Sequence, residues 1–178
     1  MTGLPSTHMR AKGVLMETYI DKIKEISQRL LTDGTVDVVI GYRKGSIPNV
    51  NEPCIIKRAE DVETLVWDSN CRLNLAAYIT DRKDKIGIIA KGCDSRNINT
   101  QIIENKIKRD QLYIIGVPCK GMTEKEDPAT LQSNCAVCHH KNPVVFDEMV
   151  AEPVAEQPEV DRYEDVRAIE AMSVQEKW

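Results

Sequence analysis

The chain has 178 residues, of which 42% are hydrophobic, 29% charged and only 4% aromatic, and its formal net charge is −4. These values are typical of a soluble globular protein, and they argue against a protein that binds single-stranded nucleic acid on aromatic side chains. No apolar run reaches the ~18 residues of a membrane-spanning helix, and the N-terminus lacks the apolar core of a secretory signal, so we expect a cytoplasmic protein that does not insert into membranes.

Helical and strand patterns alternate over residues 14–150. Apolar residues at helical spacing predict a helix over 14–31 that Gly34 ends, and residues 1–13 are expected to be disordered. Strands are predicted at 36–42, 54–58, 85–91 and 112–117, and further helices at 60–67, 71–79 and 94–106, the last with Asp94 or Ser95 as N-cap. This alternation predicts an α/β domain with a small open, mainly parallel sheet and flanking helices.

Residues 151–178 differ in composition from the rest of the chain. They hold eight acidic and three basic residues, a net charge of −5, which leaves +1 for the remainder. Two prolines indicate a linker, and a short helix is predicted over 160–172. Its apolar stripe would consist of Tyr163, Val166, Ile169 and Met172 or Val174. We expect an acidic tail that either frays or packs its stripe on a partner protein or on the chain's own domain.

Cysteines follow two predicted strands at their carboxyl ends. Cys93 follows the strand at 85–91 and Cys119 the strand at 112–117. Because parallel strands end at one edge of the sheet, where ligands bind, these two thiols should lie close together. Cys135 and Cys138 form a C-x-x-C pair in a polar loop that can fold back over this edge. Four thiolates suit zinc or a 4Fe-4S cluster, whereas disulfides are not expected in a reducing compartment.

Basic residues accompany the four cysteines, and an anionic cluster needs such neighbours. They are Lys91, Arg96, Lys120 and Lys141. A second group, Gly41, Arg43 and Lys44, ends the first strand and is a candidate for binding a cofactor's phosphates together with the loop from Lys91 to Arg96. Cys54 lies in an apolar run and is interpreted as a core residue. Cys71 remains open between a core residue and an alternate ligand.

Other interpretations of these residues are weaker. Residues 135–139 also match the haem-attachment motif C-x-x-C-H, but haem attachment occurs outside the cytoplasm and would leave Cys93 and Cys119 unexplained. Asp94 and Ser95 at a helix start can bind a phosphate, although a capping role explains them equally. Cys93 has no evident partner base, so we expect no catalytic residue. With one cluster and no second redox centre, we also expect no turnover by the isolated chain.

Several motifs resemble the beta-subunit family of deazaflavin-coenzyme-reducing hydrogenases and formate dehydrogenases. KGCDSR followed by GVPC is the most specific pair, and VDVVIGYRKGSIP, LVWDSNCRLNLAAYI and CAVCHHKNPVVFDEMV add to it. The resemblance covers residues 36–150. It implies iron–sulfur electron transfer, with Cys93, Cys119, Cys135 and Cys138 at the family's cysteine positions. The chain lacks the ferredoxin-type run C-x2-C-x2-C-x3-C that many members carry, and it is shorter than members that hold their own flavin.

Three hypotheses follow for the function of the chain. The first is an electron-transfer subunit with one 4Fe-4S cluster, passing electrons between a flavin or deazaflavin site and other clusters in an anaerobic redox complex. Its partners would be flavin and ferredoxin-type subunits of a hydrogenase, a formate dehydrogenase or a heterodisulfide-reductase-like complex. The second is a zinc-stabilised scaffold that docks other subunits. The third is a self-contained flavin oxidoreductase. The predicted organisation is a disordered segment 1–13, an α/β domain 14–150 and an acidic tail 151–178.

Overall fold

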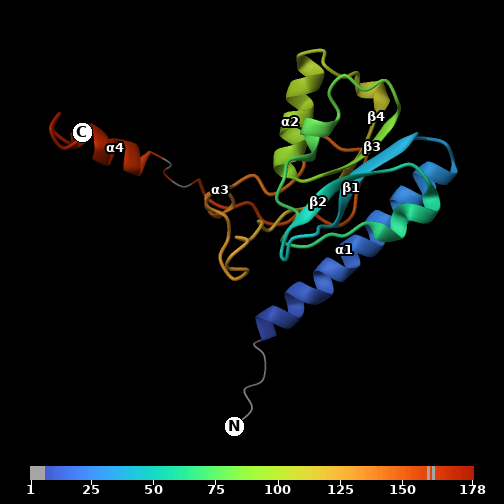
Figure 1. Cartoon of the computed structure of the whole chain (residues 1–178), viewed down its shortest axis with the longest axis horizontal. Coiled ribbons are helices and arrows are strands. Elements are labelled where there is room, and N and C mark those ends of the chain that lie inside the picture. Colours follow the sequence, from blue (N-terminus) through green and yellow to red (C-terminus); the bar gives the residue numbers. More distant parts are fainter. Residues whose placement is uncertain (1–6, 160, 162) are drawn as a thin grey trace, which may run out of the picture.

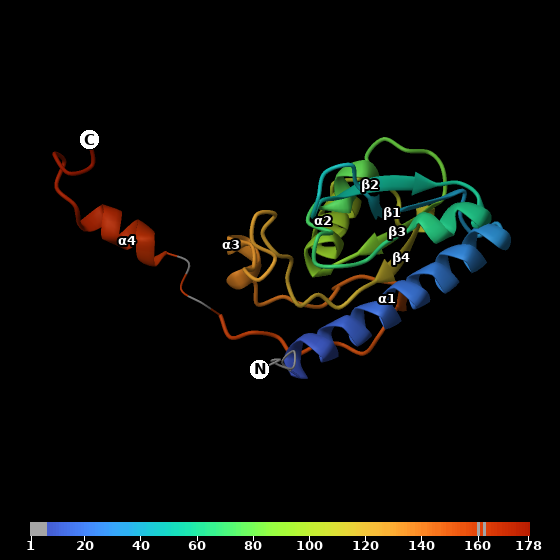
Figure 2. The ribbon, with the colours of Figure 1, turned by 60° about the horizontal axis from the view of Figure 1, so that its bottom comes forward.

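A five-stranded sheet with helices on both faces forms the body of the protein (Figures 1 and 2). The computed structural model describes residues 7–159, 161 and 163–178. The strand order is β2-β1-β3-β4-β5, with β1, β3, β4 and β5 parallel and β2 antiparallel to β1. The strands are β1 (Val38–Lys44), β2 (Asn51–Ile56), β3 (Ile86–Ala90), β4 (Leu112–Gly116) and β5 (Glu148–Met149). The predicted α/β class with a mainly parallel sheet is therefore confirmed.

The helices are of two kinds. The α-helices are α1 (Thr7–Thr32), α2 (Gly92–Ile103), α3 (Ser133–Ala136) and α4 (Glu164–Ala171). Three short 3-10 helices are η1 (Ala59–Thr64), η2 (Leu75–Tyr78) and η3 (Arg109–Gln111). None of the helices within the described residues has the length and apolar character that crossing a membrane requires.

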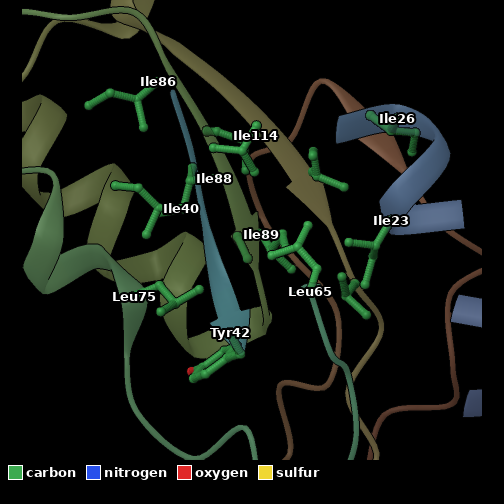
Figure 3. Packing of buried hydrophobic residues seen from close by; sticks show 14 of the residues in the cluster. Ile23, Ile26, Ile40, Tyr42, Leu65, Leu75, Ile86, Ile88, Ile89 and Ile114 are labelled. Carbon is green, nitrogen blue, oxygen red and sulfur yellow. The ribbon is translucent and has the colours of Figure 1, made fainter. Parts of the chain in front are cut away.

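Helix α1 covers one face of the sheet. It ends where predicted, at Thr32, and Gly34 then adopts a φ of +66° that suits glycine. Apolar side chains on one side of α1, including Ile23 and Ile26, are buried, and Figure 3 shows these two beside Leu65 and Ile89. The helix begins seven residues before the expected start, so residues 7–13, which we expected to be disordered, are helical; the rest of that segment lies outside the described residues.

Helix α2 and the short helix η2 cover the opposite face. Ile40, Ile88 and Leu75 lie on that side of the sheet in Figure 3, and all three are fully buried. Strands β1 and β3 alternate their side chains between the two faces, and both faces are covered. This explains why their sequences are nearly continuous in apolar character.

Two helix predictions were too long. Residues 60–67 and 71–79 form only the 3-10 helices η1 and η2. The cause is local hydrogen bonding by polar side chains, which competes with helix formation. The Asp68 carboxylate accepts the N–H of Asn70 at 2.7 Å, and the Asn74 side chain accepts the N–H of Ala76 at 3.0 Å. The two-residue strand β5 was not predicted.

The start of α2 also differs from the prediction. The N-cap is Lys91, not Asp94 or Ser95. The Asp94 carboxylate occupies the third helical position and accepts the main-chain N–H of Lys91 at 2.8 Å. The Ser95 hydroxyl donates to the carbonyl of Gly92 and accepts the N–H of Val144 at 3.0 Å. Helix α2 therefore begins at Gly92, which places Cys93 within its first turn.

The C-terminal segment leaves the sheet domain only after Glu156. The Asn142 side chain donates to the carbonyl of Val154 at 2.8 Å and accepts its N–H at 2.9 Å. The Glu156 carboxylate accepts the main-chain N–H groups of Lys141 and Asn142 at 3.0 and 3.2 Å. Beyond this point the chain runs to α4, which stands apart from the sheet in both views (Figures 1 and 2). Of the helix predicted over 160–172, residues 164–171 are helical, and Val160 lies outside the described residues.

Candidate functional site

The ends of β3 and β4 bring two cysteine segments side by side. These strands are adjacent and parallel, and Ala90 pairs with Gly116 at their carboxyl ends. The N–H of Val117 also donates to the carbonyl of Ala90 at 2.9 Å, which extends the pairing by one residue. Cys93 follows β3 in the first turn of α2, and Cys119 follows β4. The sequence predicted that both strands end at one edge of the sheet, and the structure shows in addition that they are neighbours.

All four predicted cysteine ligands line one cavity of about 230 Å³. They are Cys93, Cys119, Cys135 and Cys138. Cys93 is exposed at the surface and the other three are half-buried. No carboxylate lines this cavity within the part of the chain that the structure describes. The site is therefore rich in thiols and in positive charge.

Lys141 fixes the loop that carries the C-x-x-C pair. Its main-chain carbonyl accepts the N–H of Cys119 at 2.8 Å, and its ammonium group donates to the carbonyl of Cys135 at 3.1 Å. The Lys141 side chain is buried. One residue thus connects the segment after β4 to the helix α3, in which Cys135 lies.

Two glycines allow the close approach of these segments. A Cβ atom on Gly92 would lie 2.8 Å from the carbonyl oxygen of His140 and 2.9 Å from that of Asn142. Gly121 has a φ of +108°, and its Cβ atom would lie 2.9 Å from the Leu131 side chain. The absence of a side chain at Gly92 lets the segment after Cys138 pack against the start of α2, and its absence at Gly121 lets the loop after β4 pack closely on Leu131.

The Cys119 sulfur accepts a hydrogen bond from the main chain. The N–H of Gly121 donates to Cys119 Sγ at 3.4 Å. Bonds of this kind stabilise a thiolate and influence the potential of a metal centre that the thiolate binds. The thiol of Cys138 donates to the carbonyl of His140 at 3.4 Å.

Two of the cavity thiols are weak acids. The pKa of Cys93 is raised to about 11, mainly by the surrounding protein atoms and further by the negative charge of Asp94. Burial also raises the pKa of Cys119, although the N–H of Gly121 and the charge of Lys91 oppose this. Both groups are therefore protonated at neutral pH when no metal is present. A metal that binds them as thiolates must displace their protons.

A buried ammonium group forms part of the cavity wall. Lys91 is 1% exposed, and its Nζ donates to the hydroxyl of Tyr42 at 2.8 Å and to the carbonyl of Leu73 at 2.9 Å. It also lies 3.0 Å from a carboxylate oxygen of Asp94 and 5.7 Å from the centre of the Trp67 ring. Burial is the largest single influence and lowers the pKa of Lys91, but the charge of Asp94, together with smaller contributions from Tyr42 and Cys93, outweighs it and raises the pKa. The ammonium group is therefore charged at neutral pH.

The remaining cysteines lie outside the cavity. Cys71 is fully buried, and its sulfur accepts from the Asn51 amide at 3.4 Å and the Asp68 N–H at 3.5 Å. Cys54 is half-buried on the edge strand β2 and lines a separate, open cavity of about 560 Å³. Burial raises the pKa of each thiol to about 11.

The predicted cofactor-binding residues divide into two groups. Lys91 and Arg96 line the cysteine cavity, whereas Lys120 is exposed and lines two neighbouring cavities. Gly41 is buried against the side chains of Ile89 and Leu65. The others lie at the exposed end of β1: Arg43, which forms an ion pair with Glu52 at 2.8 Å, and Lys44. The structure does not bring the β1 group together with the cysteines.

Sequence reasoning missed several residues of the cavity wall. They are Arg72, Met122, Asn134 and His140. Arg72 directly follows Cys71 and donates hydrogen bonds to the main-chain carbonyls of residues 123 and 124. It therefore ties the loop after Cys119 to the segment that contains Cys71. In the sequence, Arg72 was marked only by its place in the segment LVWDSNCRLNLAAYI, which carries part of the family resemblance. Met122 carried no signal, because an isolated Met is compatible with any buried position.

Four thiols are donors that zinc or a 4Fe-4S cluster can use. Across residues 7–159, 161 and 163–178, however, no three or more Cys, His, Asp or Glu side chains converge closely enough to hold a metal ion. The four cysteines line a common cavity without forming an assembled metal site among the described residues.

Comparisons with known proteins identify the fold. No protein-family model matches the chain, and no curated protein matches it. Among solved structures, a chain of the F420-reducing NiFe hydrogenase complex from Methanosarcina barkeri, studied by xenon derivatization, is similar in fold, with a TM-score of 0.50 and 14% sequence identity. The match covers 62% of this chain and 39% of that chain, so the present chain corresponds to well under half of the hydrogenase chain.

Proposed function

We propose that this chain is an iron–sulfur electron-transfer subunit of a multi-subunit redox complex in the cytoplasm, of the hydrogenase or formate dehydrogenase type. One 4Fe-4S cluster would be held by Cys93, Cys119, Cys135 and Cys138. The observation that supports this most directly is that all four cysteines, which three separate segments contribute, line one cavity without a carboxylate among the described residues. The fold similarity to a chain of a hydrogenase complex agrees with it.

The bound cluster would supply reversible one-electron transfer, and the protein would supply its environment. Four thiols would act as ligands, and the N–H of Gly121 would donate to the sulfur of Cys119. The cations of the wall would balance the negative charge of the cluster. No side chain needs to act as an acid or base, and the isolated chain would pass electrons only when a partner delivers them.

A flavin is assigned to a partner subunit under this proposal. The cysteine cavity of about 230 Å³ is smaller than the ≈ 300–1,000 Å³ that is typical for binding sites of drug-sized ligands. Of the β1 group of Gly41, Arg43 and Lys44, Arg43 lines the separate open cavity of about 560 Å³ beside Cys54, and this proposal assigns no cofactor to that cavity. The partners would be the flavin-containing and ferredoxin-type subunits of the complex.

Metal analysis after anaerobic purification and reconstitution tests the proposal. We expect about four iron and four acid-labile sulfide per chain, a brown protein, and an electron paramagnetic resonance signal on reduction with dithionite. Stoichiometric zinc without sulfide would contradict the proposal and favour the zinc-stabilised scaffold. A yellow protein that retains flavin after desalting would favour the flavin oxidoreductase.

A further inference from the structure

The two cysteines of the C-x-x-C pair lie on one closed turn of the chain. Helix α3 ends at Ala136, and the N–H of Cys138 donates to the carbonyl of Cys135 at 3.3 Å. A hydrogen bond between residues i and i+3 closes a turn in which the two Cα atoms lie less than ~7 Å apart. A disulfide needs a Cα separation of about 4.4–6.8 Å. The turn therefore holds these two cysteines within reach of a disulfide without a large movement of the main chain.

The surroundings of the pair suit exchange with a small disulfide. Both thiols are free and half-buried, so each side chain is partly open to small molecules. Both line the cysteine cavity, whose wall holds Arg72 and Lys141 and no carboxylate among the described residues. Glutathione disulfide carries carboxylates, and a wall of positive charge attracts such a molecule. Charge and exposure thus favour contact between this oxidant and the pair.

The arrangement brings together two thiols, not four. Within residues 7–159, 161 and 163–178, no three or more Cys, His, Asp or Glu side chains converge closely enough for a metal ion. Cys93 and Cys119 come from the separate segments after β3 and β4, whereas one turn holds Cys135 and Cys138. Chemistry that joins two thiols therefore needs less rearrangement of the main chain than chemistry that joins four.

We propose that Cys135 and Cys138 are a redox-active dithiol of the metal-free chain, which a low-molecular-weight disulfide such as glutathione disulfide oxidises to an intrachain disulfide. One cysteine sulfur attacks the oxidant, forms a mixed disulfide and releases one glutathione thiol. The second cysteine attacks the mixed disulfide and releases the second glutathione thiol. Two electrons pass from the pair to the oxidant, and the protons of the two cysteine thiols end on the two released thiols. The reverse exchange restores the pair, so the bond is transient, as is usual for disulfides in a reducing compartment.

Oxidation of the pair also controls assembly of the cluster, and this consequence rests on the proposed function. A disulfide removes Cys135 and Cys138 as thiolate ligands and leaves Cys93 and Cys119 as the remaining thiols of the cavity. Two thiolates do not complete the four that a 4Fe-4S cluster requires. The chain therefore takes up a cluster only after the pair is reduced.

Thiol counting on the metal-free full-length chain tests the proposal. The chain is reduced with dithiothreitol, desalted in the presence of a chelator, and equilibrated at neutral pH with reduced and oxidised glutathione in defined ratios. It is then quenched with acid, labelled with N-ethylmaleimide in urea and digested for peptide mass spectrometry. As oxidised glutathione increases, we expect the six labelled thiols of the chain to fall by two, and the lost pair to map to one disulfide between Cys135 and Cys138.

Serine variants provide matched controls. Cys135→Ser and Cys138→Ser should each lose the disulfide and carry glutathione as a mixed disulfide on the remaining cysteine of the pair. Cys54→Ser removes a half-buried cysteine outside the cavity and should retain the disulfide. The mapping in the wild-type chain needs no variant, so it decides the proposal even where circular dichroism shows that a serine variant does not fold.

The outcomes separate this inference from the proposed function. A wild-type chain that keeps all its thiols, gains only mixed disulfides or bridges another pair overturns the dithiol. Cluster transfer from a loaded carrier protein, without added thiol or sulfide, then compares the reduced and oxidised chains. The oxidised chain should accept at most about a tenth as much iron as the reduced chain, and equal amounts overturn the control of assembly. A chain that forms the disulfide but accepts no cluster when reduced supports the dithiol and overturns the proposed function.

Discussion

Lys91 and Asp94 form an ion pair in which both side chains are almost completely buried, with 3.0 Å between Nζ and the carboxylate oxygen. Asp94 also accepts the main-chain N–H groups of Lys91 at 2.8 Å and of Leu75 at 3.1 Å. Cys93 lies between the two partners in the sequence. The pair therefore fixes the helical turn that presents this cysteine to the cavity.

Removing the charge of only one partner of the pair should destabilise the folded protein. Asp94→Asn leaves the buried ammonium group of Lys91 without its counter-charge, and we expect unfolding to become easier by about 3–5 kcal/mol in urea titrations. The double variant Lys91→Met with Asp94→Asn should lose less than the sum of the two single variants, because no uncompensated charge remains. As a control, Asp61→Asn breaks an exposed pair with Arg58 and should leave the unfolding midpoint unchanged. Equal effects at positions 94 and 61 would show that the buried pair is not a stabilising unit.

The four cysteines of the cavity should be individually required for the cluster. Serine at position 93, 119, 135 or 138 is expected to reduce iron and sulfide content below half of the wild-type value. Cys54→Ser and Cys71→Ser should retain the full content, since neither residue lines the cavity. The test for Cys71 is the sharper one, because that residue is buried and close in sequence to the wall residue Arg72. Loss of the cluster in Cys71→Ser, with a native circular dichroism spectrum, would place Cys71 among the ligands.

A methyl group at Gly92 should disturb the site without unfolding the domain. The Cβ atom of alanine would lie under 3 Å from two main-chain oxygens, those of His140 and Asn142, so the segment after Cys138 must move away from α2. We expect Gly92→Ala to lose about 1–3 kcal/mol of stability and to incorporate less iron. Gly34→Asn is the control, since asparagine tolerates a positive φ and nothing lies within 4 Å of that position. Full iron content in Gly92→Ala would show that the contact with α2 does not position the cysteine loop.

The thiol of Cys54 should react slowly below pH 9. Burial raises its pKa to about 11, with the charge of Arg43 opposing. Alkylation by iodoacetamide, followed by peptide mass spectrometry, should therefore accelerate about tenfold per pH unit between pH 8 and 10. In 8 M urea the same thiol should show an ordinary pKa near 8.5.

The raised pKa of Cys54 also makes the folded state less stable at alkaline pH. The unfolded chain releases the proton of Cys54 at a lower pH than the folded chain, so unfolding is favoured increasingly as pH rises above about 8.5. Cys54→Ala should reduce this dependence between pH 9 and 11 in urea titrations. An alkylation rate that levels off by pH 9 would show that burial does not control this thiol.

Removing the end of the acidic tail should leave the cysteine site intact, whereas removing its beginning as well should disturb the site. Truncation after Glu159 keeps the Glu156 carboxylate, which binds two main-chain N–H groups next to the cavity, and should leave iron content and stability unchanged. Truncation after Glu152 removes these bonds and should cost about 1–3 kcal/mol and lower the iron content. Equal behaviour of the two truncations would show that Glu156 has no role in fixing the cysteine loop.

The apolar stripe of the tail lies on an exposed helix. Tyr163, Val166, Ile169 and Met172 are 67%, 47%, 53% and 43% exposed. A helix of eight residues is marginal on its own in water, so it must gain stability elsewhere when it is ordered. The sequence left open a frayed tail, packing on the chain's own domain and packing on a partner, and the structure does not show the stripe packed on the chain's own domain. Packing on a partner subunit remains the prediction.

The sequence by itself determined the class of the fold, and it singled out the four cysteines that line one cavity. Short β-branched runs that are apolar throughout require burial on both faces, and this requirement predicts a parallel sheet covered by helices. Because parallel strands end at one edge, the positions of Cys93 and Cys119 after two predicted parallel strands were sufficient to place them at the same edge. That these strands are neighbours came from the structure. The 3-10 helices η1 and η2 were assigned incorrectly because local side-chain hydrogen bonds, such as that of Asn74, overrode the apolar spacing.

Only the tertiary structure decided which basic residues belong to the site. Lys91, Arg96 and Lys120 have the same kind of sequence context, yet Lys91 is neutralised by Asp94, Lys120 is exposed outside the cavity, and Arg96 retains an unpaired buried donor. Such differences depend on the direction in which each side chain leaves its element and on which carbonyls lie within reach. Both are fixed by contacts between segments far apart in the sequence, and spacing along the chain carries no information about them.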